Sequence, residues 1–228
     1  MAALFSPRFV KTHPTSRTGL PVGGFSLVEI VAVMAVIALL LTAGIYALGS
    51  TGGQARQVAT TTVVGMLEQA RTSAITSHCV VVLAVAEPGE YPSNDHRCRL
   101  GLFKIHEWPA KPATLDGIPL GHWQSLPVGV IILPGSVSGL RNPRDEPAIT
   151  IRYLAANQAT SGLFFLLAFS PRGSLLWPSG ADPLALRIAE GAYRNGQPTP
   201  NTRSRSGGIA ESHLQIGRIT ARPYQFDK

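Results

Sequence analysis

The sequence predicts an α+β protein in which a long N-terminal membrane-spanning helix packs on an antiparallel β-sheet globular domain. Two observations predict this class. Residues 25–48 are apolar with Glu29 as their only charged residue, and β-branched, alternating segments separated by turn residues follow from residue 78 onward. An N-terminal helix followed by a run of strands is typical of α+β domains. We therefore divide the chain into a leader (1–24), a helix (25–77) and an exported β-rich globular domain (78–228).

The apolar run 25–48 is long enough to cross a bilayer as a helix. A hydrocarbon core of about 30 Å takes roughly 20 apolar residues. In lipid the backbone must satisfy its own hydrogen bonds, which favours an α-helix. The run therefore predicts a transmembrane segment over residues 25–48.

The helix is expected to continue as an amphipathic segment over residues 49–77. Glycines 49, 52 and 53 weaken the helix at the junction, since each costs roughly 1 kcal/mol relative to alanine. Apolar residues then recur at spacings of three and four, which is the pattern of a helix with one buried face. The stripe consists of Val63, Met66, Leu67, Ala70 and Ala74.

The globular domain reads as seven or eight antiparallel strands. Turn signals separate the apolar segments, and two long stretches read as loops: 108–121, which is rich in Pro and Gly, and 191–211, which is polar. The expected strands cover residues 79–85, 97–106, 123–133, 149–154, 163–169, 174–177, 184–189 and 214–221.

The leader is basic. Arg8, Lys11 and Arg17 are its charged residues, so removing it lowers the formal net charge from +7 to +4. Basic residues before a membrane run stay on the cytoplasmic side, so the sequence predicts a cytoplasmic N-terminus and an exported remainder. The remaining positive charge is scattered, which makes nucleic acid an unlikely partner.

Glu29 is the anomaly of the apolar run. A carboxylate at mid-bilayer costs on the order of 2.5–3.5 kcal/mol on insertion scales, and intramembrane ionisable residues are functional candidates with a partner to be found. A cut after Gly24 would create such a partner, because it would free the α-amino group of Phe25.

The segment Gly24-Phe25-Ser26-Leu27-Val28-Glu29, after a basic leader and before a long apolar helix, resembles the class III prepilin signal of type IV pilins and type II secretion pseudopilins. The resemblance implies a pilin-like fold, cleavage after Gly24 by a membrane prepilin peptidase, and N-methylation of Phe25. It also implies that Glu29 serves assembly with other pilin-like subunits and an inner-membrane assembly platform. A simple signal anchor and a cleaved secretory signal are the competing interpretations.

A looser resemblance lies near the C-terminus. Phe169-x-Pro171-x-Gly173 and the later Leu214-x-Ile216-Gly217-Arg218-Ile219 are similar to the H-type minor pseudopilins of type II secretion and to the "Verru_Chthon cassette protein D" group. The expected location is therefore the inner membrane, single-pass, with the globular domain in the periplasm and a filament after assembly.

Cys79 and Cys98 are the two cysteines. An exported domain meets an oxidising compartment, where a disulfide is allowed. A Cys79–Cys98 disulfide, a pair of free thiols, and a metal site that also uses His78 and His96 all remain open, with the metal the least favoured because the spacing is not a zinc-finger pattern.

The sequence predicts a structural subunit and no enzyme. It contains no G-x-S-x-G, H-E-x-x-H, P-loop or dinucleotide-binding fingerprint, so no catalytic residue, cofactor or metal is expected. The expected function is a pilin-like or pseudopilin subunit of a periplasmic or surface filament in a secretion or pilus system. The alternatives are a membrane-anchored ligand-binding module and a minor pilin of a DNA-uptake pilus.

Overall fold

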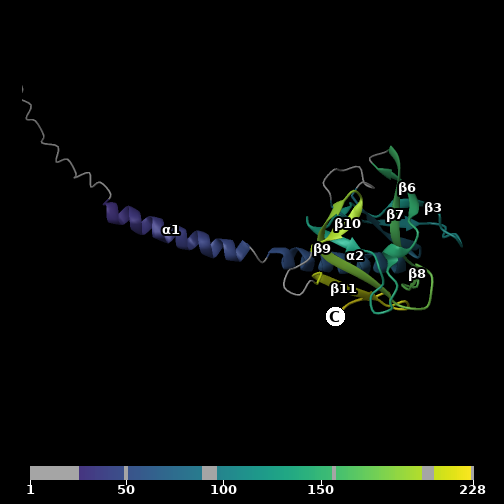
Figure 1. The fold of residues 1–228 in the computed structure, drawn as a ribbon. Coiled ribbons are helices and arrows are strands. Elements are labelled where there is room, and N and C mark those ends of the chain that lie inside the picture. Colours follow the sequence, from purple (N-terminus) through teal and green to yellow (C-terminus); the bar gives the residue numbers. More distant parts are fainter. Residues whose placement is uncertain (1–25, 49–50, 89–96, 156–157, 202–207, 227–228) are drawn as a thin grey trace, which may run out of the picture. The chain divides into compact units, whose positions relative to one another are not determined.

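The computed structural model describes residues 26–48, 51–88, 97–155, 158–201 and 208–226 (Figure 1). The chain divides into two compact units, Met1–Tyr46 and Ala47–Lys228, and each is described by itself. The first unit contributes most of one helix, and the second contains another helix and all the described strands.

The first helix, α1, covers Leu27–Leu48, and Ser26 precedes it. All the described side chains from 26 to 41 are exposed, although nearly all are apolar. Within the residues that the structure describes, no helix meets the combined length and hydropathy needed to cross a membrane. By this criterion the predicted transmembrane segment 25–48 is wrong, and so is the single-pass inner-membrane location derived from it.

The second helix, α2, covers Thr51–Ser77 and carries the expected apolar stripe. Val63, Leu67, Ala70 and Ala74 are at most 1% exposed, and Met66 packs against the same core while remaining partly exposed. The helix stops at His78, whose φ of 50° lies in the left-handed region that ends many helices.

Seven strands form the first sheet, in the order β1-β2-β3-β6-β7-β8, with β4 paired to β2. Because β1 also pairs with β7, strands β1, β2, β3, β6 and β7 close into a ring. All pairings are antiparallel except β3–β6, a parallel ladder from Thr114↔Thr150 to Asp116↔Arg152. The strands are β1 (Val80–Ala86), β2 (Arg99–Ile105), β3 (Thr114–Pro119), β4 (Gln124–Ser125), β6 (Ile149–Ala155), β7 (Gln158–Phe169) and β8 (Leu175–Trp177).

Five strands form the second sheet around the long strand β9, in the order β10-β9-β11-β12, with β5 also paired to β9. A short 3-10 turn, η1 (Pro143–Asp145), lies between β5 and β6 in the sequence. The strands are β5 (Val130–Leu133), β9 (Leu184–Arg194), β10 (Gln197–Pro200), β11 (Glu211–Ile216) and β12 (Pro223–Phe226).

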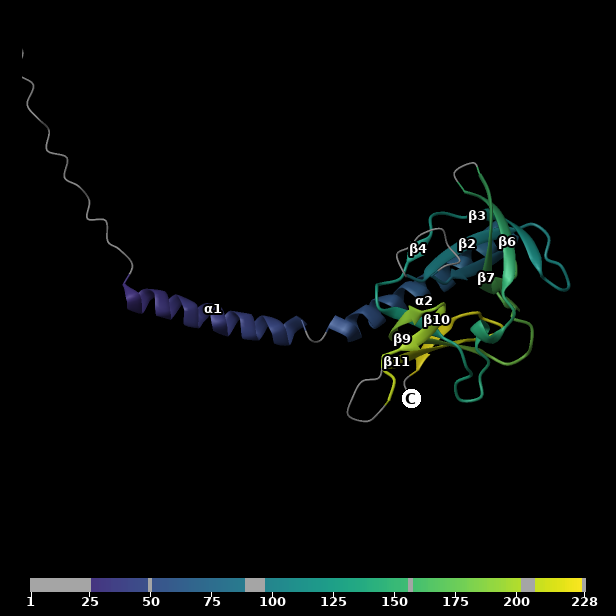
Figure 2. The same cartoon turned by 45° about the horizontal axis from the view of Figure 1, so that its top comes forward.

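The helix α2 lies against both sheets. It contacts β1 and β2 of the first sheet and β9 and β11 of the second, and Figure 2 shows it running between their strands. The large core therefore contains side chains from the helix and from both sheets, among them Leu67, Leu83 and Leu186. Burying apolar side chains from three elements in one core explains why these elements form one compact unit.

A second core lies on the other face of the first sheet. Phe103, Trp123, Tyr153 and Phe164 form an aromatic cluster there, with Phe103 and Tyr153 ring centroids 5.0 Å apart. Trp123 lies directly on β2 at Gly101, where a Cβ would come within 2.8 Å of the indole ring. The absent side chain of Gly101 is what admits the indole.

The predicted fold class is therefore wrong. The described residues contain two α-helices that fall in separate units, and the second unit is mostly β, with a closed ring of strands and a second sheet. Strands β3 and β10 lie in stretches predicted as loops, and the β3–β6 ladder is parallel where only antiparallel pairing was expected. Both missed strands are rich in Pro, Gly or polar residues, and pairing with neighbours outweighs their weak β-propensity.

Candidate functional site

The apolar surface of α1 is the most unusual feature among the described residues. Its large apolar side chains are 45–78% exposed from Leu27 to Leu41. They point in all directions around the helix, so no polar face is left for solvent. A helix that is apolar all round is normally buried, so this surface indicates an interaction site.

Glu29 lies in the first turn of α1 and is exposed. Its backbone N–H donates to the Ser26 side-chain oxygen at 3.2 Å and to the Ser26 carbonyl at 3.0 Å. The pair Ser26-x-x-Glu29 matches the capping-box pattern, and an acidic residue in a first turn is favoured by the helix dipole. The glutamate thus has a local role in starting the helix, beside any role in assembly.

The other two processing residues, Gly24 and Phe25, lie outside the described residues. The signal for the cap was present in the sequence as Ser26 three residues before Glu29, but attention to the carboxylate alone missed it.

Cys79 and Cys98 are both free thiols, so the candidate disulfide is not formed. The β1–β2 register explains this, because it pairs Val80 with Ile105 at one end and Ala86 with Arg99 at the other. Cys79 precedes the first end and Cys98 the second. With a rise of about 3.3 Å per residue, a ladder of this length holds them far beyond the roughly 7 Å that a disulfide spans.

The candidate metal site also included His78 and His96. His78 adjoins Cys79 at the end of α2, and His96 lies outside the described residues. Within the described residues no group of His, Cys, Asp or Glu side chains has the geometry of a metal site.

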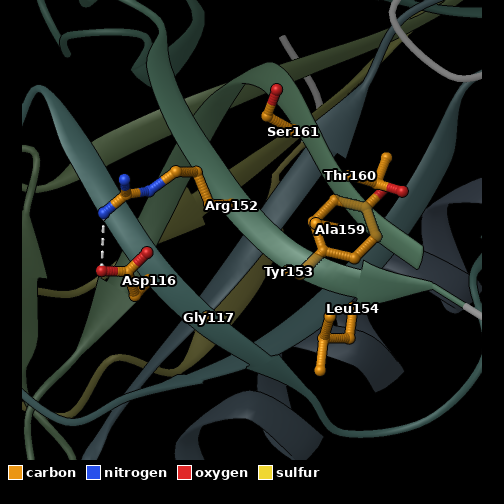
Figure 3. Close-up of a pocket in the computed structure, with 8 residues that line it drawn as sticks. All are labelled: Asp116, Gly117, Arg152, Tyr153, Leu154, Ala159, Thr160 and Ser161. Carbon is orange, nitrogen blue, oxygen red and sulfur yellow. Dashed lines mark hydrogen bonds and ion pairs between the residues drawn. The ribbon is translucent and has the colours of Figure 1, made fainter. Parts of the chain in front are cut away.

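Two open grooves of about 520 Å³ each meet at Tyr153 and Leu154 of β6. One is lined from β3, β6 and β7, as Figure 3 shows, and an Asp116–Arg152 ion pair of 2.8 Å lies in it. Both charged side chains are more than 60% exposed, so solvent screens the pair. The other groove extends toward His122 and Trp123. The volumes are in the range of small-ligand sites, but both grooves are open to solvent.

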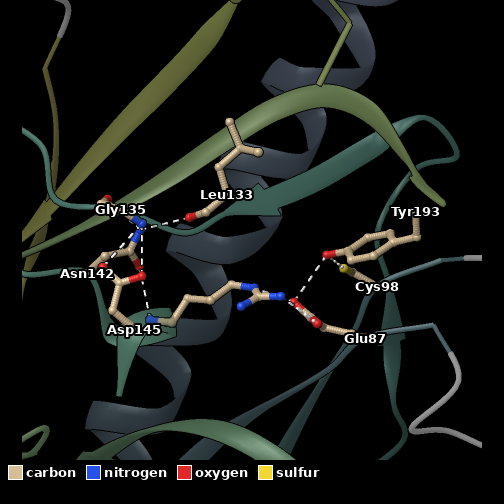
Figure 4. Close-up of polar contacts among 8 residues, drawn as sticks. Glu87, Cys98, Leu133, Gly135, Asn142, Asp145 and Tyr193 are labelled. Carbon is tan, nitrogen blue, oxygen red and sulfur yellow. Dashed lines mark hydrogen bonds and ion pairs between the residues drawn. The ribbon is translucent and has the colours of Figure 1, made fainter. Parts of the chain in front are cut away.

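A more buried polar cluster lies near the ends of β1 and β9. Figure 4 shows Glu87, Cys98 and Tyr193 converging, with the Cys98 Sγ and Tyr193 Oη 2.9 Å apart. Burial raises the pKa of Cys98 to about 12, against a weaker lowering by the hydrogen bond with Tyr193. Burial also raises the pKa of Tyr193, and the nearby Cys98 and Glu87 raise it further. Both groups therefore stay protonated at neutral pH, which gives a hydrogen-bonded cluster and not an activated nucleophile.

The sequence offered no signal for this cluster. Tyr193 and Glu87 are 106 positions apart in the sequence, and Arg144, whose guanidinium donates to the Glu87 carboxylate, is 57 positions from Glu87. Only the folded chain brings them together.

Comparison of the chain with known proteins identifies no relative. The chain matches no model of a known protein family, no curated protein and no solved structure. The likeness of the N-terminal segment to prepilin signals therefore rests on its own residues.

Proposed function

We propose that this chain is a pilin-like structural subunit that is processed after Gly24 and assembles through α1. The observation that carries the proposal is the uncovered apolar surface of α1, together with its position directly after the Gly24-Phe25 junction. A surface of this kind needs a partner, and other copies of the same helix are a partner of matching chemistry.

The driving force would be the burial of apolar side chains between helices. Fully burying one Val, Leu, Ile or Met side chain contributes roughly 1.5–3 kcal/mol. Side chains such as Met34 and Leu40, 64% and 67% exposed, would lose their contact with water in a bundle of copies. The ordering of the subunits opposes this gain.

Glu29 would favour one axial alignment of the packed helices. In a bundle its carboxylate loses water, and an unpaired buried charge is costly. Cleavage after Gly24 would provide a cation, the α-amino group of Phe25 on a neighbouring copy. Pairing of the two groups would favour one axial register over the others.

The partners in this proposal are a prepilin peptidase and other pilin-like subunits. The globular unit, with its own cores and sheets, would be displayed by the helical bundle.

A second candidate function is ligand binding by the globular unit. The two grooves that meet at Tyr153 and Leu154 favour it, since an aromatic side chain with several polar groups is a common ligand-site lining. This role is compatible with assembly.

Mass spectrometry of the N-terminus of the protein purified from its own host tests the processing step. We expect a chain that starts at Phe25 and carries one methyl group, and a Gly24→Trp variant that keeps the leader. An intact Met1, or a start at Ser50, would contradict the proposal.

A further inference from the structure

The two sheets of the globular unit share no ladder within the described residues. They are joined through α2, which packs on both, and through η1, which contacts β7 of the first sheet and β9 of the second. The sheets also share the large apolar core, and the Leu175 N–H of β8 donates to the Arg218 carbonyl beyond β11 at 2.9 Å. Among these connections, the turn is a polar one that depends on a few side chains.

The turn η1 is attached to the second sheet at the end of β5. The Asn142 side-chain amide donates to the carbonyl oxygens of Leu133 at 2.8 Å and Gly135 at 3.1 Å. The backbone N–H of Gly135 donates in return to both carboxylate oxygens of Asp145, at 2.9 and 3.1 Å. Figure 4 shows these four residues drawn together. Because β5 pairs with β9, these hydrogen bonds tie the turn to the second sheet.

From this turn Arg144 reaches the first sheet. Its Nε lies 2.5 Å from Glu87 Oε1 and its Nη2 lies 2.8 Å from Glu87 Oε2, which is a two-point contact. Glu87 directly follows β1. Both side chains are less than 20% exposed, so the pair is screened far less than an exposed one. The guanidinium carbon also lies 6.0 Å from the ring centroid of Phe165 in β7.

A second contact crosses the same boundary. Tyr193 of β9 lies 2.9 Å from the Cys98 sulfur, and its hydroxyl donates to Glu87 Oε1 at 3.4 Å. Cys98 immediately precedes β2 and is fully buried. Glu87 thus accepts from Arg144 and from Tyr193, and both donors come from the side of the second sheet.

We infer that Glu87, Arg144, Tyr193 and Cys98 form a latch that holds the two sheets together, and that the globular unit opens at this point with α2 as the common hinge. A cavity of about 100 Å³ adjoins the latch and is lined by Glu87, Arg144 and Phe165 among others, so water has a route to the ion pair. Opening would expose Cys98 and the large core beside it. The inference concerns the globular unit alone and does not depend on the proposed function.

The rate at which a thiol reagent labels Cys98 in the full chain reports the opening. Cys79 serves as the reference thiol, since it is partly exposed and lies at the other end of β1. We expect Glu87→Gln to raise the Cys98 labelling rate at least tenfold, and Tyr193→Phe to raise it by a smaller factor. The Cys79 rate should not change.

The control is Asp116→Asn, which breaks a single-point ion pair of 2.8 Å between exposed side chains within one sheet. It should leave Cys98 labelling at the wild-type rate. The latch is excluded if Asp116→Asn raises the Cys98 labelling rate as much as Glu87→Gln does, or if Glu87→Gln leaves that rate unchanged. It is also excluded if the labelling rates of Cys79 and Cys98 rise together, because that indicates global unfolding. Should Glu87→Gln fail to fold, as judged by circular dichroism, Tyr193→Phe decides by the same criteria.

Discussion

The helices α1 and α2 are neighbours in the sequence, yet their apolar side chains differ in how far they are buried. In α2 the apolar residues form one stripe, and Val63 and Leu67 are at most 1% exposed beneath two sheets. In α1 nearly every residue is apolar, and Met34 and Leu40 are about two-thirds exposed. The less apolar helix is the one that its own chain covers. The difference shows that α2 stabilises the globular unit, whereas the apolar side chains of α1 remain exposed.

One matched pair of substitutions tests this difference between α1 and α2. Leu67→Ala should destabilise the globular unit by about 2–5 kcal/mol, because it removes buried methyl groups and leaves a cavity. Leu40→Ala should change the free energy of unfolding of the globular unit by less than about 0.5 kcal/mol, since its side chain is 67% exposed. Chemical denaturation of the two variants measures both values. Equal losses would mean that α1 also packs on the globular unit.

A second test separates two roles at the N-terminus of α1, helix capping and assembly. Ser26→Ala removes the side-chain acceptor of the Glu29 N–H and should cost about 0.5–2 kcal/mol of helix stability, but it leaves the carboxylate in place. Glu29→Leu removes the carboxylate and should weaken assembly while processing after Gly24 continues. Helix content by circular dichroism and the assembled fraction by sedimentation separate the effects. If both variants lose helix and assembly in equal measure, Glu29 acts as a cap alone.

A further test concerns the pH dependence that Cys98 gives to the stability of the globular unit. Its pKa is about 12 in the folded protein, against 9.0 for an ordinary cysteine. The folded state therefore binds this proton more tightly than the unfolded state does. Its stabilising contribution is complete below pH 9 and declines as the pH rises toward 12. A Cys98→Ala variant should lose less stability than wild type over this window, as followed by denaturation at several alkaline pH values. Parallel curves for the two proteins would show that Cys98 does not titrate with folding.

Local patterns in the sequence predicted the elements that depend on local information. The three- and four-residue spacing of Val63, Leu67 and Ala70 predicted the buried stripe of α2, and the structure confirms the burial. Alternation predicted strands such as 149–154, which lies within β6.

Features that arise from distant pairing could not be predicted in this way. The ring closes because β1 pairs with β7 and β3 lies parallel to β6, and neither contact leaves a periodic trace in one sequence. The latch has the same cause, since Glu87 and Tyr193 are 106 positions apart and meet only in the folded chain. The capping pattern of Ser26 and Glu29 was present in the sequence and was overlooked.

Photo-crosslinking from α1 tests the central claim most directly, namely that the apolar helix is covered by other copies of the chain. A photoreactive amino acid would replace Met34, and Ile219, an 86% exposed residue of the globular unit, would carry the same group as a control. After irradiation of producing cells, the account predicts a ladder at multiples of the chain mass from position 34 and far less from position 219. Position 34 giving no self-crosslinks, or no more than position 219, would contradict assembly through α1.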